Sequence, residues 1–336
     1  MASCLVTGAT GFVGRNLVEH LLQRGWAVRC SVRPSSDVTQ LETLGVELVT
    51  SSLESGEGLK EAVAQVDHVF HVAGRTNALK AKELEDTNVR GVERLVEVCA
   101  RQQSPPSFLL VSSLAAGGPG TFQRPRKEAD PDEPVSEYGR SKLAGEQAAA
   151  QFASELPLSI IRPPIIFGPG DRAGLSLYNS IRTMRIHPRP GFREFPVSLV
   201  HVSDLCEAMI QVAERGQRVG ANGQVDRQAG TYYVAAERAL SYADFGKMAG
   251  AAAGWSAFVL PLPPAAFWIA GGIGEVVGRA RRRACLLNFD KIREALSKGW
   301  VCSDRKIRDE LGYQQAAPLE DRFAETVLWY REHGWL

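Results

Sequence analysis

Short apolar runs alternate with amphipathic stretches through the first half of the chain. The runs have the length of strands, and the stretches between them carry apolar residues at helical spacing. This alternation predicts a parallel β-sheet with helices on both faces, because parallel strands need long crossover connections. The predicted strands are Ser3–Val6, Ala27–Val32, Val46–Val49, His68–Val72, Phe108–Val111 and Leu158–Ile161, and the predicted helices are Asn16–Arg24, Gly58–Ala64, Asn88–Arg101 and Tyr138–Leu156.

The pattern changes after about Pro163, where Pro and Gly become dense and helices then predominate toward the C-terminus. We therefore expect an α/β fold in two parts. Residues 1–165 would form a Rossmann-type, doubly wound parallel sheet, and residues 166–336 a smaller lobe that mainly binds substrate. Two later apolar segments, Ser198–Val202 and Thr231–Val234, are predicted to return to the main sheet.

A glycine-rich segment joins the first predicted strand to the first predicted helix. Gly8, Gly11 and Gly14 have the spacing GxxGxxG, a variant of the dinucleotide-binding fingerprint. Gly8 permits the tight turn, Gly11 lets the backbone approach a pyrophosphate, and Gly14 lets the helix pack closely. The start of the helix supplies N–H donors for the phosphates. The other loop residues predicted to line the cofactor are Thr10, Phe12 and Val13.

The end of the second predicted strand indicates which nicotinamide cofactor binds. Enzymes that use NAD place an acid about twenty residues after the glycine loop, where it bonds the ribose 2′-hydroxyl. Here the segment 31–36 holds no acid, and the first one is Asp37. Arg33, helped by Ser35, could instead pair with a 2′-phosphate. NADP(H) is therefore favoured, and NAD(H) is the alternative.

Polar residues with catalytic potential follow the fifth predicted strand. Ser112 and Ser113 end that strand, and Tyr138 and Lys142 share one face of the next helix, since they are four residues apart. Ser113 would hold a substrate oxygen, and Tyr138 would transfer a proton to or from it. Lys142, together with an oxidised nicotinamide, would lower the pKa of the phenol. Asn88 would anchor a water in a proton relay or cap its helix.

In this order, these segments resemble the extended short-chain dehydrogenase/reductase family, within the NAD-dependent epimerase/dehydratase superfamily. The nearest branch is that of 3β-hydroxysteroid dehydrogenases and dihydroflavonol reductases. The resemblance covers essentially the whole chain. The matching segments are TGATGFVG at 7–14, TNVRG at 87–91, VSS at 111–113, YGRSK at 138–142, IRPPIIFGPG at 161–170 and VHVSD at 200–204.

The resemblance implies roles for particular residues. Ser113, Tyr138 and Lys142 would form the catalytic triad, and Pro163 and Ile165 would lie near the nicotinamide carboxamide. Family members commonly carry Asp-Leu after the third strand, where this chain has Ser52-Leu53; Ser can still bond the adenine amine. His71 is expected to be a packed strand residue rather than a base. The remaining cofactor-binding positions are Ser52, Leu53, Val72, Ala73, Gly74 and Ser112.

The reaction expected is the interconversion of an alcohol and a carbonyl on a small, apolar or polycyclic substrate. The alternative within the family is an NAD-dependent nucleotide-sugar epimerase or dehydratase. The dehydratases place acids directly after the catalytic hydroxyl, whereas Leu114–Gly117 follow it here. The alternative from another class is a non-catalytic dinucleotide-binding sensor, in which Tyr138 or Lys142 would usually be lost.

Composition narrows the choice of partners. The 336 residues carry a formal net charge of +1, which argues against a nucleic-acid binder. The six cysteines are scattered, so no metal site is expected and reduced thiols are predicted. A strand begins at Ser3 with no basic segment before it, so we expect no signal peptide and a cytoplasmic protein.

Two features leave the partners open. The apolar stretch Trp255–Val277 is interrupted by prolines, and its proline-free part, Ala265–Val277, is too short to span a bilayer. Followed by arginines, the segment 255–283 would be a lid or core segment, or a peripheral membrane contact. A homodimer could form through the helices that carry Asn88 and Tyr138, but the same apolar faces could pack on the sheet. The residues concerned are Val92, Leu95, Val96 and Cys99.

Overall fold

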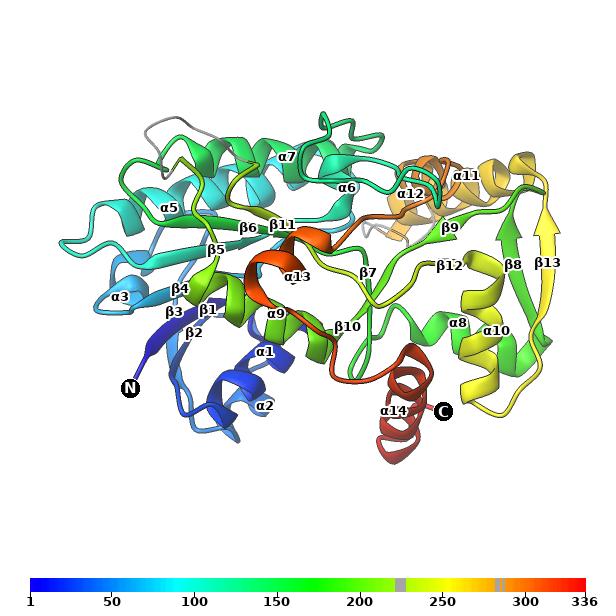
Figure 1. Ribbon diagram of the computed structural model, residues 1–336, viewed down its shortest axis with the longest axis horizontal. Coiled ribbons are helices and arrows are strands. Elements are labelled where there is room, and N and C mark those ends of the chain that lie inside the picture. Colours follow the sequence, from blue (N-terminus) through cyan, green and yellow to red (C-terminus); the bar gives the residue numbers. More distant parts are fainter. Residues whose placement is uncertain (221–227, 282–284, 286–287) are drawn as a thin grey trace.

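The computed structural model describes residues 1–220, 228–281, 285 and 288–336, and its centre is a seven-stranded sheet (Figure 1). The strand order is β11-β6-β5-β4-β1-β2-β3, and every pairing is parallel. The order reverses between β1 and β4, which is where such folds bind ligands. The strands are β1 Ser3–Thr7, β2 Ala27–Val32, β3 Glu47–Thr50, β4 His68–His71, β5 Ser107–Val111, β6 Leu158–Arg162 and β11 Thr231–Tyr233.

Helices cover both faces of this sheet, which confirms the predicted doubly wound α/β fold. Successive strand residues point to opposite cores: Val6 packs under one layer of helices and Leu5 under the other. The first layer consists of α1 Phe12–Gln23, α2 Thr39–Glu42, α9 Val202–Arg215 and α13 Arg305–Leu311, and the second of α3 Leu59–Val63, α5 Gly91–Ala100 and α7 Glu137–Ala150.

The apolar side chains considered for a dimer interface are part of the second core. Val92, Leu95, Val96 and Cys99 on α5 are each at most 1% exposed. They pack against the sheet of their own chain, together with Phe108 and Leu110. These residues therefore offer no surface to a second copy.

One of the two later strands predicted for the main sheet is not in it. β11 pairs with β6 as predicted, but β10 (Leu199–His201) pairs with β7 (Ile165–Phe167) in a separate two-stranded sheet. Pro163 and Pro164 separate β6 from β7, and proline lacks the N–H that would continue the ladder. The chain therefore leaves the main sheet here, and the prediction for Ser198–Val202 was wrong.

A third core lies outside the main sheet, among short strand pairs and helices, and we call the elements outside the main sheet and its two helix layers the second lobe (Figure 1). β9 pairs with β12, and β8 pairs with β13. The elements of the second lobe are α8 Leu175–Met184, β8 Ile186–Pro190, β9 Pro196–Val197, β12 Leu240–Ser241, α10 Tyr242–Ala252, β13 Phe258–Leu262, α11 Pro264–Arg281, α12 Phe289–Ala295 and α14 Leu319–Glu332. Three short helices connect strands of the main sheet: α4 Ala81–Glu85, the π-helix η1 Asp86–Arg90 and α6 Leu114–Gly117.

Helix α7 is shorter than predicted and ends at Ala150. Pro157 disfavours helical backbone at Leu156, and turn hydrogen bonds occupy residues 151–156 instead.

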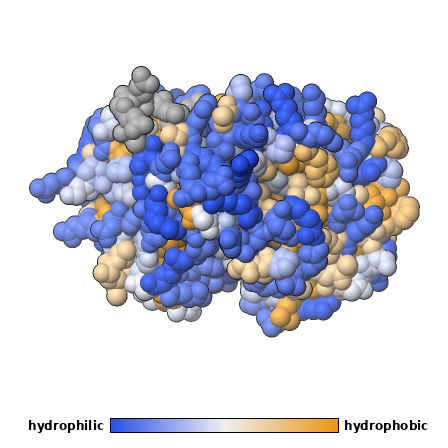
Figure 2. Space-filling model, in the orientation of Figure 1, coloured by the Kyte–Doolittle hydropathy of each residue, from blue (hydrophilic) through white to orange (hydrophobic). Residues whose placement is uncertain are grey.

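Apolar surface gathers at the end of the molecule that carries β13, β8 and α11, on the right of Figure 2, whereas the opposite end is mainly hydrophilic. Within the described residues, α11 and the other helices all fall short of the length and apolar composition that crossing a membrane requires. Arg282 and Arg283, which belong to the segment considered for membrane contact, lie outside the described residues.

Candidate active site

The glycine loop forms a tight cradle at the carboxyl end of β1. Gly8 has a φ of 72°, and a Cβ there would lie 2.7 Å from the backbone nitrogen of Ala73, which follows β4. A Cβ on Gly14 would lie 2.1 Å from the Gly8 oxygen. Neither position has room for a side chain, so the loop brings backbone close to backbone.

The start of α1 is open to an anion. Its N-cap residue, Gly11, makes no side-chain cap, and its first turn contains no acid. The first N–H groups of a helix lack partners within the helix, and they carry the positive end of its dipole. This loop and helix start therefore fit the pyrophosphate of a dinucleotide.

A single cleft of about 1680 Å³ opens above the cradle. It is lined by every residue predicted for the site except Asn88. The predicted residues in its wall are Gly8, Thr10, Gly11, Phe12, Val13, Gly14, Arg33, Ser35, Ser52, Leu53, Val72, Ala73, Gly74, Ser112, Ser113, Tyr138, Lys142, Pro163 and Ile165.

Ser113 and Tyr138 meet in this cleft. Ser113 caps α6 by accepting a hydrogen bond from the Ala115 nitrogen, 3.1 Å away. Tyr138 lies in the first turn of α7, and the Ser113 hydroxyl is close enough to its phenol to lower the pKa of that phenol. A substrate oxygen that met both hydroxyls would have a partner to hold it and a partner to exchange a proton with.

Lys142 lies one turn further along α7 and is 7% exposed. Its Nζ donates a hydrogen bond of 2.7 Å to the carbonyl oxygen of Val111, at the end of β5. Burial lowers the pKa of Lys142 to about 8, and the nearby Glu146 carboxylate opposes that fall. Lys142 therefore remains mainly charged at neutral pH.

Beneath Lys142 lies a buried ion pair that the sequence did not reveal. Glu146 is 0% exposed and accepts hydrogen bonds from Nε and Nη2 of Arg162, at 2.8 and 2.5 Å, and from Ser112. Arg162 also bonds Asp132 and the Tyr233 hydroxyl, at 2.7 and 3.1 Å. The pair joins α7 to β6 directly behind the catalytic candidates. The only sequence signal was an acid four residues after Lys142.

Opposing influences act on the pKa of Tyr138. Burial raises the pKa of the phenol above its usual value, and Lys291 is the largest influence in the opposite direction. The prediction assigned the lowering to Lys142 together with an oxidised nicotinamide, and it stays a prediction; the Lys142 amine bonds a backbone carbonyl here. Lys291 lies on α12, and no pattern in the sequence indicated that this helix contacts Tyr138.

Asn88 is buried behind the cleft and does not cap a helix. It lies within the π-helix η1 and is 2% exposed. Its Oδ1 accepts from the Arg75 nitrogen at 2.8 Å, and its Nδ2 donates to the Arg75 oxygen at 2.8 Å and the Ser141 hydroxyl at 2.9 Å. The prediction of a cap was wrong. These bonds hold the loop that follows β4 against α7.

His71 packs in the sheet, as predicted. It is 0% exposed, and its Nδ1 lies 2.7 Å from the Thr7 hydroxyl. Burial first, and then the charge of Lys142, lower its pKa to about 3. The imidazole is therefore neutral, and it does not line the cleft.

Arg33 lies at the mouth of the cleft, after β2, and is exposed. In the described part of the chain, no residue forms an ion pair or hydrogen bond with its guanidinium. Asp37, the nearest acid along the chain, accepts hydrogen bonds from the Thr39 nitrogen and hydroxyl at 3.2 and 2.8 Å, which lower its pKa. The positive charge at this end of the cleft is therefore open to a ligand.

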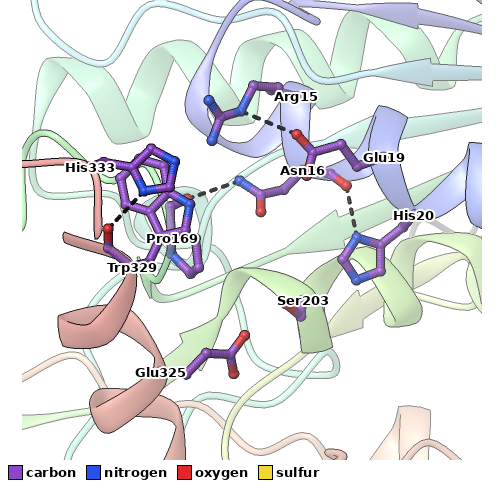
Figure 3. Close-up of a pocket in the computed structure, with 9 residues that line it drawn as sticks. All are labelled: Arg15, Asn16, Glu19, His20, Pro169, Ser203, Glu325, Trp329 and His333. Atoms are coloured by element: carbon purple, nitrogen blue, oxygen red, sulfur yellow. Dashed lines mark hydrogen bonds and ion pairs between the residues drawn. The ribbon is translucent and has the colours of Figure 1, made fainter. Parts of the chain in front are cut away.

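A second cavity of about 280 Å³ lies beside the glycine loop, where α1 approaches α14 (Figure 3). The Arg15 guanidinium lies 5.7 Å from the centre of the Trp329 ring, which stacks on His333 at 3.8 Å. Asn16 donates to the Pro169 oxygen at 3.1 Å. Of the residues described, none of those predicted for the site lines this cavity, so we regard it as a packing seam that fixes α14 against α1.

Two relatives cover nearly the whole chain. A ceramide reductase from Caulobacter vibrioides is 30% identical over 98% of this chain and 95% of its own length. A 4-hydroxy-2-methyl-3-oxo-4-farnesyl-3,4-dihydroquinoline-1-oxide ketoreductase from Stigmatella aurantiaca is 31% identical over 92% of this chain and 90% of its own length.

Solved structures share the fold. A UDP-glucose 4-epimerase from Thermotoga maritima, solved with UDP-glucose, has a TM-score of 0.77 at 19% identity and covers 98% of this chain and 99% of its own. Relatives named as sterol and dihydroflavonol enzymes agree with the resemblance to the 3β-hydroxysteroid dehydrogenase branch. The model of the NAD dependent epimerase/dehydratase family matches residues 4–226. The chain therefore belongs to this family, and it is an NAD(P)-dependent enzyme of the extended short-chain dehydrogenase/reductase type.

Proposed function

We propose that this enzyme interconverts a ketone and a secondary alcohol on an apolar molecule, with NADP(H) as the hydride carrier. The observation that carries the proposal is the position of Tyr138 beside Ser113 and Lys142, in the wall of the same cleft as the glycine loop. The relatives named as a ceramide reductase and a ketoreductase support carbonyl reduction.

Three residues of the chain have separate roles in the proposed reaction: Ser113, Tyr138 and Lys142. The bound cofactor supplies the hydride for reduction or accepts it in oxidation. Ser113 holds the substrate oxygen, and Tyr138 donates its hydroxyl proton to that oxygen in reduction and accepts one in oxidation. The Lys142 ammonium lies near Gly74 and the end of β5, where it can donate a hydrogen bond to the cofactor ribose.

An apolar substrate fits the far wall of the cleft. Aromatic and proline side chains from the second lobe line it: Pro190, Phe195, Tyr242, Trp300 and Trp335. Binding a hydrocarbon against such a wall is favourable by roughly 25 cal/mol for each Å² of apolar surface that is buried. We therefore infer a lipid-like or polycyclic ketone as the substrate class.

A panel of apolar ketones tests this function, with NADPH and NADH consumption compared at equal concentrations. We expect turnover of an apolar ketone with NADPH. Absence of turnover across ketones and alcohols, despite cofactor binding, would favour the sensor alternative. Release of tightly held NAD on denaturation would favour the epimerase alternative.

Arg33 is the residue that we propose selects NADP(H). Replacing it with alanine removes a charge-assisted bond to the 2′-phosphate, worth about 1.5–3 kcal/mol, so the KM for NADPH should rise roughly 10–100-fold. The KM for NADH should change little, because its ribose carries no phosphate there. Steady-state kinetics with both cofactors measure the two values.

The matched control is Arg101→Ala, which removes an arginine whose side chain is 73% exposed and which follows the last residue of α5. It should leave both KM values unchanged. An equal rise for NADPH and NADH in Arg33→Ala would contradict selection through the phosphate.

We also propose that α11 rests on a membrane that contains anionic lipid. Four neighbouring apolar side chains on α11 are 40–68% exposed, and we call them the α11 apolar face: Trp268, Ile269, Ile273 and Val276. Arg279 and Arg281 follow at the end of the same helix and complement anionic headgroups.

Sedimentation with vesicles tests this contact. The protein should bind phosphatidylcholine vesicles that contain phosphatidylserine more than tenfold better than the double variant Ile269→Glu, Ile273→Glu, since each buried isoleucine contributes about 1.5–3 kcal/mol. Leu328→Glu, at a residue 57% exposed on α14, is the control and should bind like the unchanged protein. Equal binding of the double variant would overturn the contact, and a dimer lost in the double variant would assign the face to a second copy.

A further inference from the structure

Helix α12 lies against the start of α7, although the two are far apart in the sequence. The Asp290 carboxylate accepts hydrogen bonds from the backbone nitrogens of Glu137 and Tyr138, at 2.7 and 3.1 Å. The first N–H groups of a helix lack partners within the helix, and an anion there also complements its dipole. A residue of the second lobe thus fixes the backbone that carries the catalytic tyrosine.

Lys291, the next residue on α12, lies against the Tyr138 ring. Its Nζ is 4.6 Å from the ring centre and 2.8 Å from Oε2 of Glu294. The other oxygen of Glu294 accepts a hydrogen bond of 2.6 Å from the Ser136 hydroxyl, which itself caps α7 by accepting from the Gly139 nitrogen at 2.9 Å. The ammonium is therefore held in place by a chain of bonds that ends in the helix of Tyr138.

The charges that face the Tyr138 ring come from two helices. Lys291 and Glu294 on α12 act on the phenol, and Asp290 on the same helix bonds the Tyr138 backbone nitrogen; Lys142, on α7 itself, bonds the Val111 oxygen. Ser113 adds a neutral hydroxyl from the start of α6. Among the cations, Lys291 is the one that acts most strongly on the phenol.

We propose that Lys291 is a positioning residue for proton transfer at Tyr138, holding the ring in place and stabilising its phenolate. The proposal rests on the proposed function of Tyr138. In reduction the Tyr138 O–H bond breaks, an O–H bond forms at the substrate oxygen, and the negative charge stays on the phenolate oxygen. A cation at the ring face favours that charged form. Asp290 fixes the backbone of Tyr138, and Glu294 fixes the ammonium of Lys291, so the ring and the cation stay in contact.

Replacing Lys291 with methionine tests the proposal, because methionine keeps much of the length and removes the charge. A cation over an aromatic ring contributes about 0.5–2 kcal/mol, so kcat should fall roughly 2- to 30-fold, with KM for NADPH unchanged. The limb of the pH–rate profile that belongs to Tyr138 should move to higher pH in both directions of reaction, because the phenol then holds its proton more tightly.

Two further variants separate a charge effect from a folding effect. Lys291→Arg keeps the cation and should restore the pH profile. Lys298→Met removes an exposed lysine that follows α12 and should behave like the unchanged protein. An unmoved pH profile in Lys291→Met, or one that Lys291→Arg fails to restore, would overturn the proposal.

A measurement without turnover keeps this test apart from that of the function. The ionisation of Tyr138 can be followed by ultraviolet difference absorbance against Tyr138→Phe. We expect a higher phenol pKa in Lys291→Met than in the unchanged protein and in Lys291→Arg. If the pKa shifts while no carbonyl is reduced, the proposed function fails and the action of Lys291 stands. If the pKa does not shift while ketones are reduced, the proposed function stands and the action of Lys291 fails.

Discussion

Tyr138→Phe is expected to lower kcat by about 10²- to 10⁴-fold, the range of a lost general acid–base group. The substitution removes the hydroxyl beside Ser113 and keeps the ring beneath Lys291. Cofactor affinity should therefore stay nearly constant, because the glycine cradle and Lys142 are untouched. NADPH consumption measures the first effect, and fluorescence titration with NADPH measures the second.

Tyr178→Phe is the matched control for this experiment. Tyr178 lies on α8 in the second lobe, is 3% exposed and does not line the cleft. Its loss should leave kcat unchanged. Near-full activity in Tyr138→Phe would exclude it as the proton donor.

Glu146→Gln is expected to lower the free energy of unfolding by about 3 kcal/mol, the lower end of the range for breaking a buried ion pair. The amide leaves the guanidinium of Arg162, which is 3% exposed, without its main counter-charge, although Asp132 still bonds it. The amide group also places a donor among the donors of Arg162. Urea unfolding followed by circular dichroism measures the loss.

The same substitution at an exposed pair provides the comparison. Glu320, which is 56% exposed, pairs with Arg238, which is 44% exposed, and Glu320→Gln should cost at most about 1 kcal/mol. An equally small cost for Glu146→Gln would show that Arg162 does not depend on its buried partner. A large cost in both variants would point to a general effect of the substitution.

The sequence predicts those parts of the site that depend on local structure. The strands and the glycine loop follow from hydrophobic periodicity and from backbone requirements at Gly8 and Gly14, which act over a few residues. Because parallel strands end at one edge, residues such as Ser113 and Arg33 are expected in one cleft before any contact is known. Tyr138 and Lys142 follow from helical spacing.

The parts that the sequence does not predict depend on distant contacts. β10 leaves the main sheet because Pro163 and Pro164 redirect its partner β7, which no pattern within β10 reveals. The pKa of Tyr138 depends on burial and on Lys291, a residue that only the packing of α12 brings near. Asn88 matched the position of a helix start, but the added π-helical turn puts it inside a helix.

The position of α12 along the chain has a consequence for how such enzymes diverge. It follows α11 and its apolar face almost directly along the chain, and its first turn lies against Tyr138. One short stretch, residues 264–295, therefore supplies both an apolar surface and the cation beside the proton donor. A chimaera that exchanged this stretch with that of a relative would change the proposed membrane contact and the turnover rate together, so membrane attachment and speed would be inherited as one trait.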